Sequence, residues 1–293
     1  MKILLLGNTG QLGWELERSL ATLGELRAID YPELNLVDLN GTSQLIRDFK
    51  PNLIVNATAY TAVDRAESER ELALAINAHG PALLAEEANV LGATLVHYST
   101  DYVFDGNKGE PYVETDQPAP LGVYAESKLA GERAVQNAGG SYLIFRTSWV
   151  YSLRRDSFVT KVLKWSRQQR TLKLVSDQIS NPTWSRMLAE VTGQLVAMAG
   201  KDLAGWVTER SGLYHLAGWG YASRLEWGKE ILSLDVKKAE QVAEEVIPTL
   251  TNEFPTPATR PLFSALNCDR FEHTFGLRLP SWQQALRMAM DSL

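Results

Sequence analysis

Tyr124 and Lys128 lie four residues apart in the stretch VYAESKLAGE, which is built mostly of good helix formers. Four residues make slightly more than one helical turn, so both side chains leave the same face of a helix. A tyrosine ordinarily has a pKa of about 10 and is a poor acid at neutral pH. A neighbouring ammonium favours the phenolate and would move Tyr124 towards the working range of a general acid–base. A surface pair on an ordinary helix face is the alternative that the spacing alone leaves open.

A second polar cluster, Ser99, Thr100 and Asp101, follows the apolar run ATLVHY. Ligands of parallel sheets bind beyond the carboxyl ends of the strands, where these residues are expected. Thr100 is therefore a candidate to hydrogen-bond a substrate oxygen. For Ser99 the simpler expectation is that its hydroxyl ties off a backbone group.

The turn GNTGQLG places Gly7, Gly10 and Gly13 three residues apart, between the apolar run KILLL and a helical stripe. Glycines there permit a tight turn and let backbone N–H groups approach a pyrophosphate at a helix N-terminus. The spacing differs from the commoner G-x-G-x-x-G pattern, and an ordinary strand-to-helix turn is the alternative. The strand–turn–helix context favours a dinucleotide site.

Asp30 closes the next predicted strand, 17 residues after Gly13. A carboxylate there can accept a hydrogen bond from an adenosine ribose 2′-hydroxyl and would repel a 2′-phosphate. No arginine or lysine occurs in the glycine turn itself, so these residues lean towards NADH. Asp30 could equally cap the loop, and both roles stay open.

The first half of the chain alternates apolar, strand-like runs with amphipathic helical stripes. Strands are expected at about 2–7, 25–30, 52–59, 93–104 and 141–151, and helices at about 13–24, 42–49, 71–92 and 123–132. This alternation predicts an α/β fold with a Rossmann-like, doubly wound parallel sheet.

The second half is expected to form a smaller domain that closes over the ligand cleft. We place a dinucleotide-binding Rossmann domain at residues 1–150 and a mainly substrate-binding domain at 151–293, with some elements returning to the sheet. Amphipathic helices are expected at 183–200 and 281–293, and the proline-marked stretch 252–267 is expected to be irregular.

The chain of 293 residues has a formal net charge of −6 and a single cysteine, Cys268. The acidic balance argues against a broad electrostatic grip on nucleic acid or an anionic membrane, so a few placed groups must hold any anionic ligand. One cysteine cannot form an internal disulfide or a metal–thiolate cluster. The N-terminal apolar run is too short for a signal peptide and no later run could span a membrane, which predicts a cytoplasmic protein.

Together these stretches resemble an extended short-chain dehydrogenase/reductase and, within that superfamily, the dTDP-4-dehydrorhamnose reductases. The resemblance covers nearly the whole chain, through GNTGQLG, NATAYTAVDRAE, STDYVFDG, VYAESKLAGE, IFRTSWVY and PTPATRP. It implies that NADPH or NADH reduces the C4 ketone of dTDP-4-dehydro-L-rhamnose to give dTDP-L-rhamnose. That product of dTDP-rhamnose biosynthesis supplies cell-surface polysaccharide such as the O-antigen of lipopolysaccharide.

The resemblance also implies the site residues. The catalytic residues would be Thr100, Tyr124 and Lys128, with Tyr124 protonating the alkoxide and Lys128 also holding the nicotinamide ribose. The cofactor would contact Gly7, Asn8, Thr9, Gly10, Gln11, Leu12, Gly13, Asp30, Asp38, Leu39, Ala59, Tyr60, Thr61, Tyr98, Tyr124 and Lys128. The sugar nucleotide would meet Thr100, Asp101, Tyr124, Trp149 and, through its pyrophosphate, Arg260. A magnesium ion is implied too, with ligands that the sequence leaves unassigned.

Several alternatives stay open. Trp149 could pack against the sugar or base, or it could be a core tryptophan. Arg260 could bind a phosphate through two parallel hydrogen bonds, or it could form a surface ion pair. A sugar-nucleotide epimerase or dehydratase would share the fold, as would a non-catalytic subunit like the regulatory subunit of methionine adenosyltransferase. A scaffold has no need of both Tyr124 and Lys128, which favours an enzyme. The sequence leaves open the preferred cofactor, the nucleotide on the sugar and whether the chain forms a homodimer.

Overall fold

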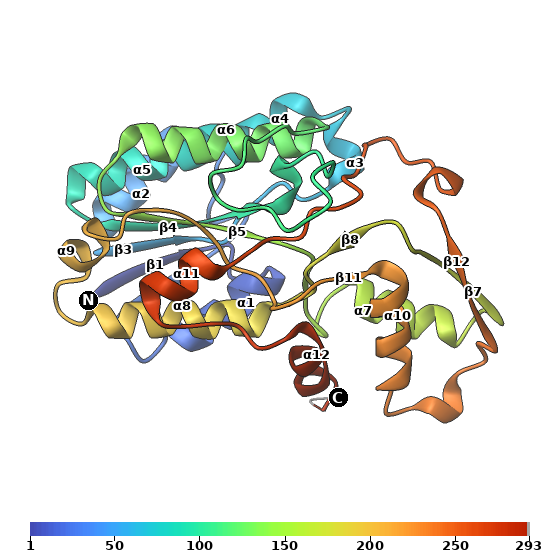
Figure 1. The fold of residues 1–293 in the computed structure, drawn as a ribbon. Coiled ribbons are helices and arrows are strands. Elements are labelled where there is room, and N and C mark those ends of the chain that lie inside the picture. Colours follow the sequence, from blue (N-terminus) through green and yellow to red (C-terminus); the bar gives the residue numbers. More distant parts are fainter. Residues whose placement is uncertain (292–293) are drawn as a thin grey trace.

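A six-stranded parallel sheet organises the computed structural model, which describes residues 1–291 (Figure 1). Its strands lie in the order β2 (Glu25–Ile29), β1 (Lys2–Leu6), β3 (Leu53–Asn56), β4 (Thr94–Thr100), β5 (Tyr142–Thr147) and β10 (Gly212–His215). All the residues of β3, β4 and β10 are buried, as expected for strands covered on both faces. The predicted fold class is confirmed. Because β2 and β3 flank β1 on opposite sides, the strand order reverses at β1, where such sheets bind ligands.

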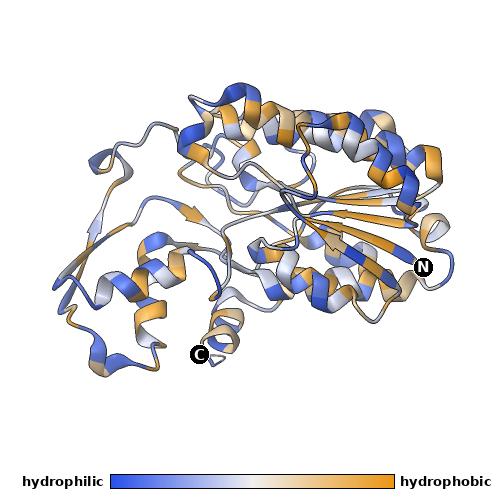
Figure 2. Ribbon diagram, turned by 180° about the vertical axis from the view of Figure 1, so that it is seen from behind, coloured by the Kyte–Doolittle hydropathy of each residue, from blue (hydrophilic) through white to orange (hydrophobic). Residues whose placement is uncertain are grey.

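Helices cover both faces of this sheet (Figure 1). One face carries α1 (Gln11–Leu20), α8 (Ser185–Ala199), α9 (Leu203–Thr208) and α11 (Asp269–Phe275). The other carries α2 (Leu39–Phe49), α3 (Val63–Ala66), α4 (Arg70–Leu74), α5 (Gly80–Leu91) and α6 (Val123–Ala138). A π-helical turn, η1 (Ala75–His79), joins α4 to α5, so the helix expected at 71–92 contains one wider turn. Figure 2 shows the strands of the sheet as the hydrophobic layer between helices with hydrophilic outer faces.

One apolar core lies on each face of the sheet. A third apolar core lies beside the sheet and belongs to the second half of the chain. It is built by α7 (Phe158–Ser166), β7 (Thr171–Val175), α10 (Arg224–Ser233), β12 (Glu245–Thr249) and α12 (Trp282–Met290). The short strands β6 (Val150–Tyr151) and β9 (Thr183–Trp184) pair with each other, as do β8 (Ile179–Ser180) and β11 (Ala222–Ser223). Single 3₁₀ turns form η2 (Asp101–Val103), η3 (Lys238–Glu240) and η4 (Thr251–Glu253).

The chain passes more than once between the third core and the sheet. Of the elements after residue 150, β10 is a strand of the sheet and α8, α9 and α11 pack on it; α8 is the helix expected at 183–200. The stretch 252–267 is irregular after its first residues, as predicted. The last two residues of the helix expected at 281–293 lie outside the described residues. The domain division at residue 150 stays a prediction.

The strand expected at 141–151 is interrupted where the chain leaves the sheet. β5 ends at Thr147, and Trp149 adopts a left-handed backbone conformation with φ of +41°. A bulky residue rarely adopts this conformation, and it persists only where the surroundings hold it. The turn directs β6 away from β5 and towards the third core, and the Trp149 ring packs against that core.

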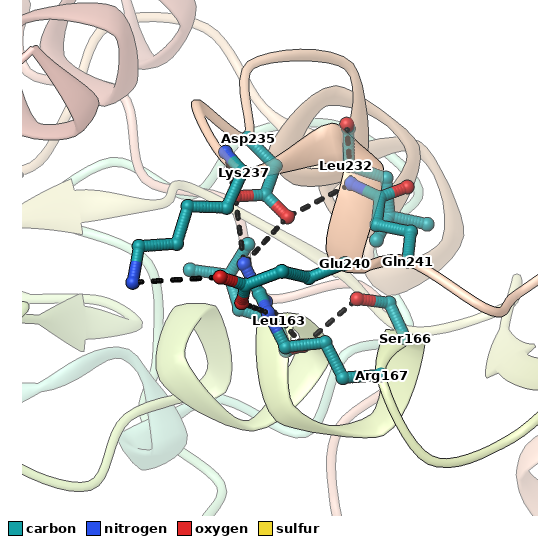
Figure 3. Close-up of polar contacts among 8 residues, drawn as sticks. All are labelled: Leu163, Ser166, Arg167, Leu232, Asp235, Lys237, Glu240 and Gln241. Carbon is teal, nitrogen blue, oxygen red and sulfur yellow. Dashed lines mark hydrogen bonds and ion pairs between the residues drawn. The ribbon is translucent and has the colours of Figure 1, made fainter.

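Arg167, just after α7, fastens that helix to the segment that follows α10 (Figure 3). Its guanidinium donates to both carboxylate oxygens of Asp235, at 2.9 and 3.0 Å, and to Glu240 at 2.8 Å. The Asp235 carboxylate also accepts from the side-chain amide of Gln241 at 2.9 Å. Asp235 is almost fully buried, so these donors satisfy a carboxylate that water does not reach. The network holds the two main helices of the third core together.

A fully buried ion pair fastens α6 to β5. Glu132 accepts from Nε of Arg146 at 2.9 Å and from its Nη2 at 2.6 Å, and Ser99 donates to the same carboxylate. The expectation that Ser99 ties off a backbone group is therefore wrong, because Glu132 lies within its reach in the folded chain. The Glu132 side chain is 0% exposed and that of Arg146 is 4% exposed.

Removing the charge of Glu132 should destabilise the fold strongly. Glu132→Gln leaves Arg146 buried without a counter-charge, and loss of one partner of a buried pair typically costs about 3–5 kcal/mol. Glu126→Gln is the matched control on the same helix, because Glu126 pairs with Arg70 at the surface, where a pair is worth about 0–1 kcal/mol. The free energy of unfolding in urea measures both. A loss for Glu132→Gln no larger than that for the control would contradict the role given to this pair.

Candidate functional site

A cavity of about 830 Å³ opens at the carboxyl ends of the central strands and collects residues from distant segments. Of the residues chosen from the sequence, its wall contains Gly7, Thr9, Gly10, Gln11, Leu12, Asp30, Ala59, Thr61, Tyr98, Thr100, Asp101, Tyr124, Lys128 and Trp149. The wall does not include Asn8, Gly13, Asp38, Leu39, Tyr60 or Arg260. Asp38 instead caps the N-terminus of α2 by accepting from the N–H of Gly41, and the Tyr60 hydroxyl donates to Glu69.

The glycine turn is built by close backbone contacts. Gly7 has a φ of +88°, which a side chain would disfavour, and its N–H donates to the carbonyl of Ile29 at 2.7 Å. A Cβ on Gly13 would lie 1.9 Å from the carbonyl oxygen of Gly7, so only glycine lets α1 start this close to β1. Gly13 therefore shapes the turn from inside. The start of α1 then meets the cavity through Gly10 and Gln11, as an anion site requires.

Asp30 braces this turn. Its Oδ2 accepts from the Thr9 hydroxyl at 2.5 Å and from the Thr9 N–H at 3.2 Å, and its Oδ1 accepts from the N–H of Tyr31 at 2.8 Å. Loop capping is thus one role of Asp30. The carboxylate also lies in the cavity wall, so its contact with a ribose stays a prediction.

The cavity fits a dinucleotide. Besides the glycine turn, Gln11 Oε1 and Thr147 Oγ1 are buried and have no hydrogen-bond partner among the described residues, and both side chains belong to the wall. A buried polar atom without a partner is costly, and a polar ligand would satisfy it. The cradle and these orphaned atoms together fit a cofactor such as NADH or NADPH.

Lys128 is the buried cation of the site. It is 2% exposed, and its ammonium donates to the carbonyl of Tyr98 at 2.6 Å and lies 3.5 Å from Nε2 of His97. Burial lowers the pKa of Lys128 to about 8, partly opposed by Glu132 one helical turn away. Burial lowers the pKa of His97 well below its usual value, and the positive charge of Lys128 lowers it further, so His97 is neutral.

Tyr124 lies on the same helix face, but its pKa moves in the direction opposite to that expected. Burial raises the pKa of Tyr124 above its ordinary value, and a hydrogen bond with Thr100 only partly opposes this. The expectation that Lys128 lowers the pKa of Tyr124 is wrong here, because loss of solvent outweighs the other influences on the phenol. Tyr124 is consequently protonated at neutral pH and has a proton to donate.

Asp101 organises the end of β4 and links it to the second half of the chain. Its carboxylate accepts from Ser180 at 3.0 Å and from Ser264, and Thr100 Oγ1 donates to it at 3.2 Å. Burial raises the pKa of Asp101, and the hydroxyl donors oppose the rise. Asp101 is therefore held by protein groups and helps to orient the Thr100 hydroxyl.

Arg260 is committed to other protein groups. Its guanidinium forks the Asp64 carboxylate at 3.0 and 2.8 Å and also donates to the hydroxyl of Thr256 and the carbonyl of Ala258. The ion-pair alternative thus describes its present contacts. Its contact with a substrate pyrophosphate stays a prediction.

Sequence reasoning missed two arginines in the cavity wall, Arg155 and Arg224. The guanidinium of Arg224 lies over the Trp149 ring, 3.7 Å from its centre, and Trp149 in turn stacks on Trp227 with 5.6 Å between ring centres. The capping box formed by Ser223 and Glu226 marks the start of α10 in the sequence and could have drawn attention to Arg224. No local signal marks Arg155, whose partner is remote in the chain.

The described residues provide no metal site and no membrane-spanning helix. Within residues 1–291, no group of three or more His, Cys, Asp and Glu side chains could hold a metal ion. The magnesium ion implied by the resemblance thus has no support in these residues. Over the same range no helix is both long and apolar enough to cross a membrane.

Similarity to known proteins identifies the family. The chain is 41% identical to dTDP-4-dehydrorhamnose reductase of Escherichia coli K12 over 100% of this chain and 98% of that protein. It is 39% identical to the enzyme of that name from Burkholderia thailandensis over 100% and 99%. A family model described as the RmlD substrate binding domain matches residues 1–293. The chain belongs to this reductase family. The family predicted from the sequence is confirmed.

Solved structures of the reductase family share the whole fold. A dTDP-4-dehydrorhamnose reductase from Clostridium acetobutylicum has a TM-score of 0.91 at 34% identity, with 100% of this chain and 99% of that chain covered. The Bacillus anthracis enzyme, solved in complex with NADP, has a TM-score of 0.90 at 32% identity, with the same shares covered. A Thermus thermophilus UDP-glucose 4-epimerase, 21% identical with a TM-score of 0.79 and 99% and 98% covered, is similar in fold alone.

The pKa of Lys128 should limit cofactor binding on the alkaline side. With a pKa of about 8, the ammonium is present below that pH and is lost above it. If the ammonium holds the nicotinamide ribose, the KM for NADH should rise above about pH 8. Lys128→Arg keeps its charge over this whole range and should lose the rise, whatever its absolute activity. If the KM for NADH of the Lys128→Arg variant also rose above about pH 8, the ionisation would belong to another group.

Proposed function

We propose that the chain reduces dTDP-4-dehydro-L-rhamnose to dTDP-L-rhamnose with NADPH or NADH, as the last step of dTDP-rhamnose biosynthesis. The observation that carries the proposal is one cavity that joins a glycine turn to Thr100, Tyr124 and Lys128 in a member of the reductase family. A cofactor cradle at one end and a proton donor beside a buried cation at the other are the parts that ketone reduction needs.

The residues supply the proton and hold the reacting oxygen. When bound, NADH or NADPH would supply the hydride that reduces C4 of the sugar. Tyr124, kept protonated by its raised pKa, gives its proton to the alkoxide oxygen that forms. On substrate binding the Thr100 hydroxyl would turn from Asp101 and donate its one hydrogen bond to that oxygen. Lys128 holds the ribose and offers a positive charge near the tyrosinate that remains. Bulk water then restores the proton of Tyr124.

The third core would supply the substrate-binding part of the site. Trp149 and Arg224 form a flat apolar and cationic wall, which suits a sugar or base beside a phosphate. Arg224 is half-buried in the cavity wall, whereas Arg260 is already forked to Asp64. Arg224 is therefore the stronger candidate for the diphosphate of the dTDP-sugar. A cytoplasmic location and a homodimer stay predictions from the sequence.

Tyr124→Phe tests the chemistry. It keeps the ring and removes the hydroxyl, so kcat should fall about 10²–10⁴-fold, the usual worth of general acid catalysis, while the cofactor still binds. The assay follows nicotinamide absorbance with dTDP-4-dehydro-L-rhamnose and either cofactor. Tyr112→Phe is the matched control, because Tyr112 is a buried tyrosine that hydrogen-bonds Asp105 outside the cavity wall. Near-normal turnover by Tyr124→Phe would refute the mechanism.

Arg224→Gln and Arg260→Gln test which arginine binds the substrate diphosphate. A charge-assisted hydrogen bond is worth about 1.5–3 kcal/mol, so Arg224→Gln should raise the KM for the sugar nucleotide roughly tenfold or more. The KM for NADH should stay nearly unchanged. Arg260→Gln should have the smaller effect on the sugar nucleotide. The reverse order would return the diphosphate to Arg260.

A further inference from the structure

Arg155 reaches the glycine turn from a loop of the second half, 146 residues away in the chain. Its Nη1 donates to the carbonyl oxygen of Thr9 at 2.7 Å, and its side chain lies in the cavity wall together with Thr9 and Asp30. The glycine turn itself contains no cation, so this loop brings a positive charge that the turn lacks.

Thr9 is held from both sides by opposite charges. Arg155 binds its carbonyl, while Asp30 accepts from its N–H at 3.2 Å and from its hydroxyl. Asp30 is the residue placed at the adenosine ribose in the proposed cofactor site. The Arg155 guanidinium and the Asp30 carboxylate, which would meet the ribose 2′-position, therefore both bind the same residue, Thr9.

The neighbouring Arg154 is engaged elsewhere. It stacks on Trp14, with its guanidinium 3.5 Å from the ring centre, and Arg18 stacks on the same ring at 3.2 Å. Arg155, by contrast, forms no ion pair with the residues that the structure describes, and its partner is the neutral carbonyl of Thr9. A guanidinium has five N–H donors, so Arg155 can keep its bond to Thr9 and still offer two parallel donors to a phosphate.

We propose that Arg155 binds the 2′-phosphate of NADPH and offsets the repulsion that Asp30 exerts on it. The inference rests on the proposed cofactor site and adds the residue that sets cofactor preference there. NADH lacks the 2′-phosphate and keeps the ribose hydroxyl that Asp30 can accept from, so each cofactor meets one of the two side chains. A family relative solved in complex with NADP shows that this fold can accommodate the phosphorylated ribose.

Steady-state kinetics of the full chain with each cofactor test the proposal. Arg155→Gln should lower kcat/KM for NADPH about tenfold or more and leave that for NADH within about twofold, since a charge-assisted bond is lost from one cofactor only. Arg155→Lys should retain part of the NADPH activity. Arg154→Gln, the matched control, should leave the ratio unchanged because Arg154 contacts Trp14. Asp30→Asn should move the ratio the opposite way, towards NADPH.

Calorimetry gives a second reading that does not depend on turnover. Adenosine 2′,5′-bisphosphate should bind the wild-type chain more tightly than adenosine 5′-monophosphate, and Arg155→Gln should remove that difference. Equal loss of NADPH and NADH activity would mean that Arg155 contacts the shared pyrophosphate, and no loss of either would mean that it only fastens the loop. Both results would overturn the inference. A wild-type chain that bound neither cofactor would refute the proposed function itself.

Discussion

Burial of charge at the carboxyl end of β4 is the constraint on which the site depends. Asp101, Lys128 and Glu132 are all nearly inaccessible to water, with exposures of 2%, 2% and 0%. A buried charge is tolerated only when protein groups replace its hydration. Each of the three therefore has a specific partner: serine hydroxyls for Asp101, a backbone carbonyl for Lys128 and a guanidinium for Glu132. These partners come from β4, β5, β8 and the irregular stretch after η4, so satisfying the charges assembles the site.

The same burial sets the protonation states. Desolvation disfavours the charged form of any acid or base, which raises the pKa of Tyr124 and lowers that of Lys128 to about 8. The two groups thus meet with the tyrosine protonated and the lysine still mostly charged at neutral pH. A proton donor is prepared by exclusion of water, and the nearby cation is available for the phenolate only after the proton has moved.

An acidic chain must bind anionic ligands with individual cations, and these come mainly from the second half. Arg155 reaches the glycine turn, and Arg224 lies on the Trp149 ring at the other end of the cavity. Arg155 belongs to the segment that leaves the sheet after Trp149, where the left-handed turn redirects the chain, and Arg224 starts α10 after the chain has returned to the sheet as β10 and left it again. The sheet thus supplies the backbone cradle and the proton donor, while the third core supplies charge and aromatic surface.

Local patterns in the sequence were sufficient for strands β1 to β5 of the sheet, the glycine turn and the placement of Tyr124 and Lys128 on one helix face. Strand and helix periodicities repeat within a few residues, and a turn needs only its own glycines, so no distant contact has to be known. The tertiary structure alone decided that β10 joins the sheet, that Ser99 donates to Glu132 and that Arg260 pairs with Asp64. It also decided the direction of the pKa shift of Tyr124 and the presence of Arg155 beside Thr9. These features depend on which remote segments pack together and exclude water, and the sequence of a single helix or turn does not determine that packing.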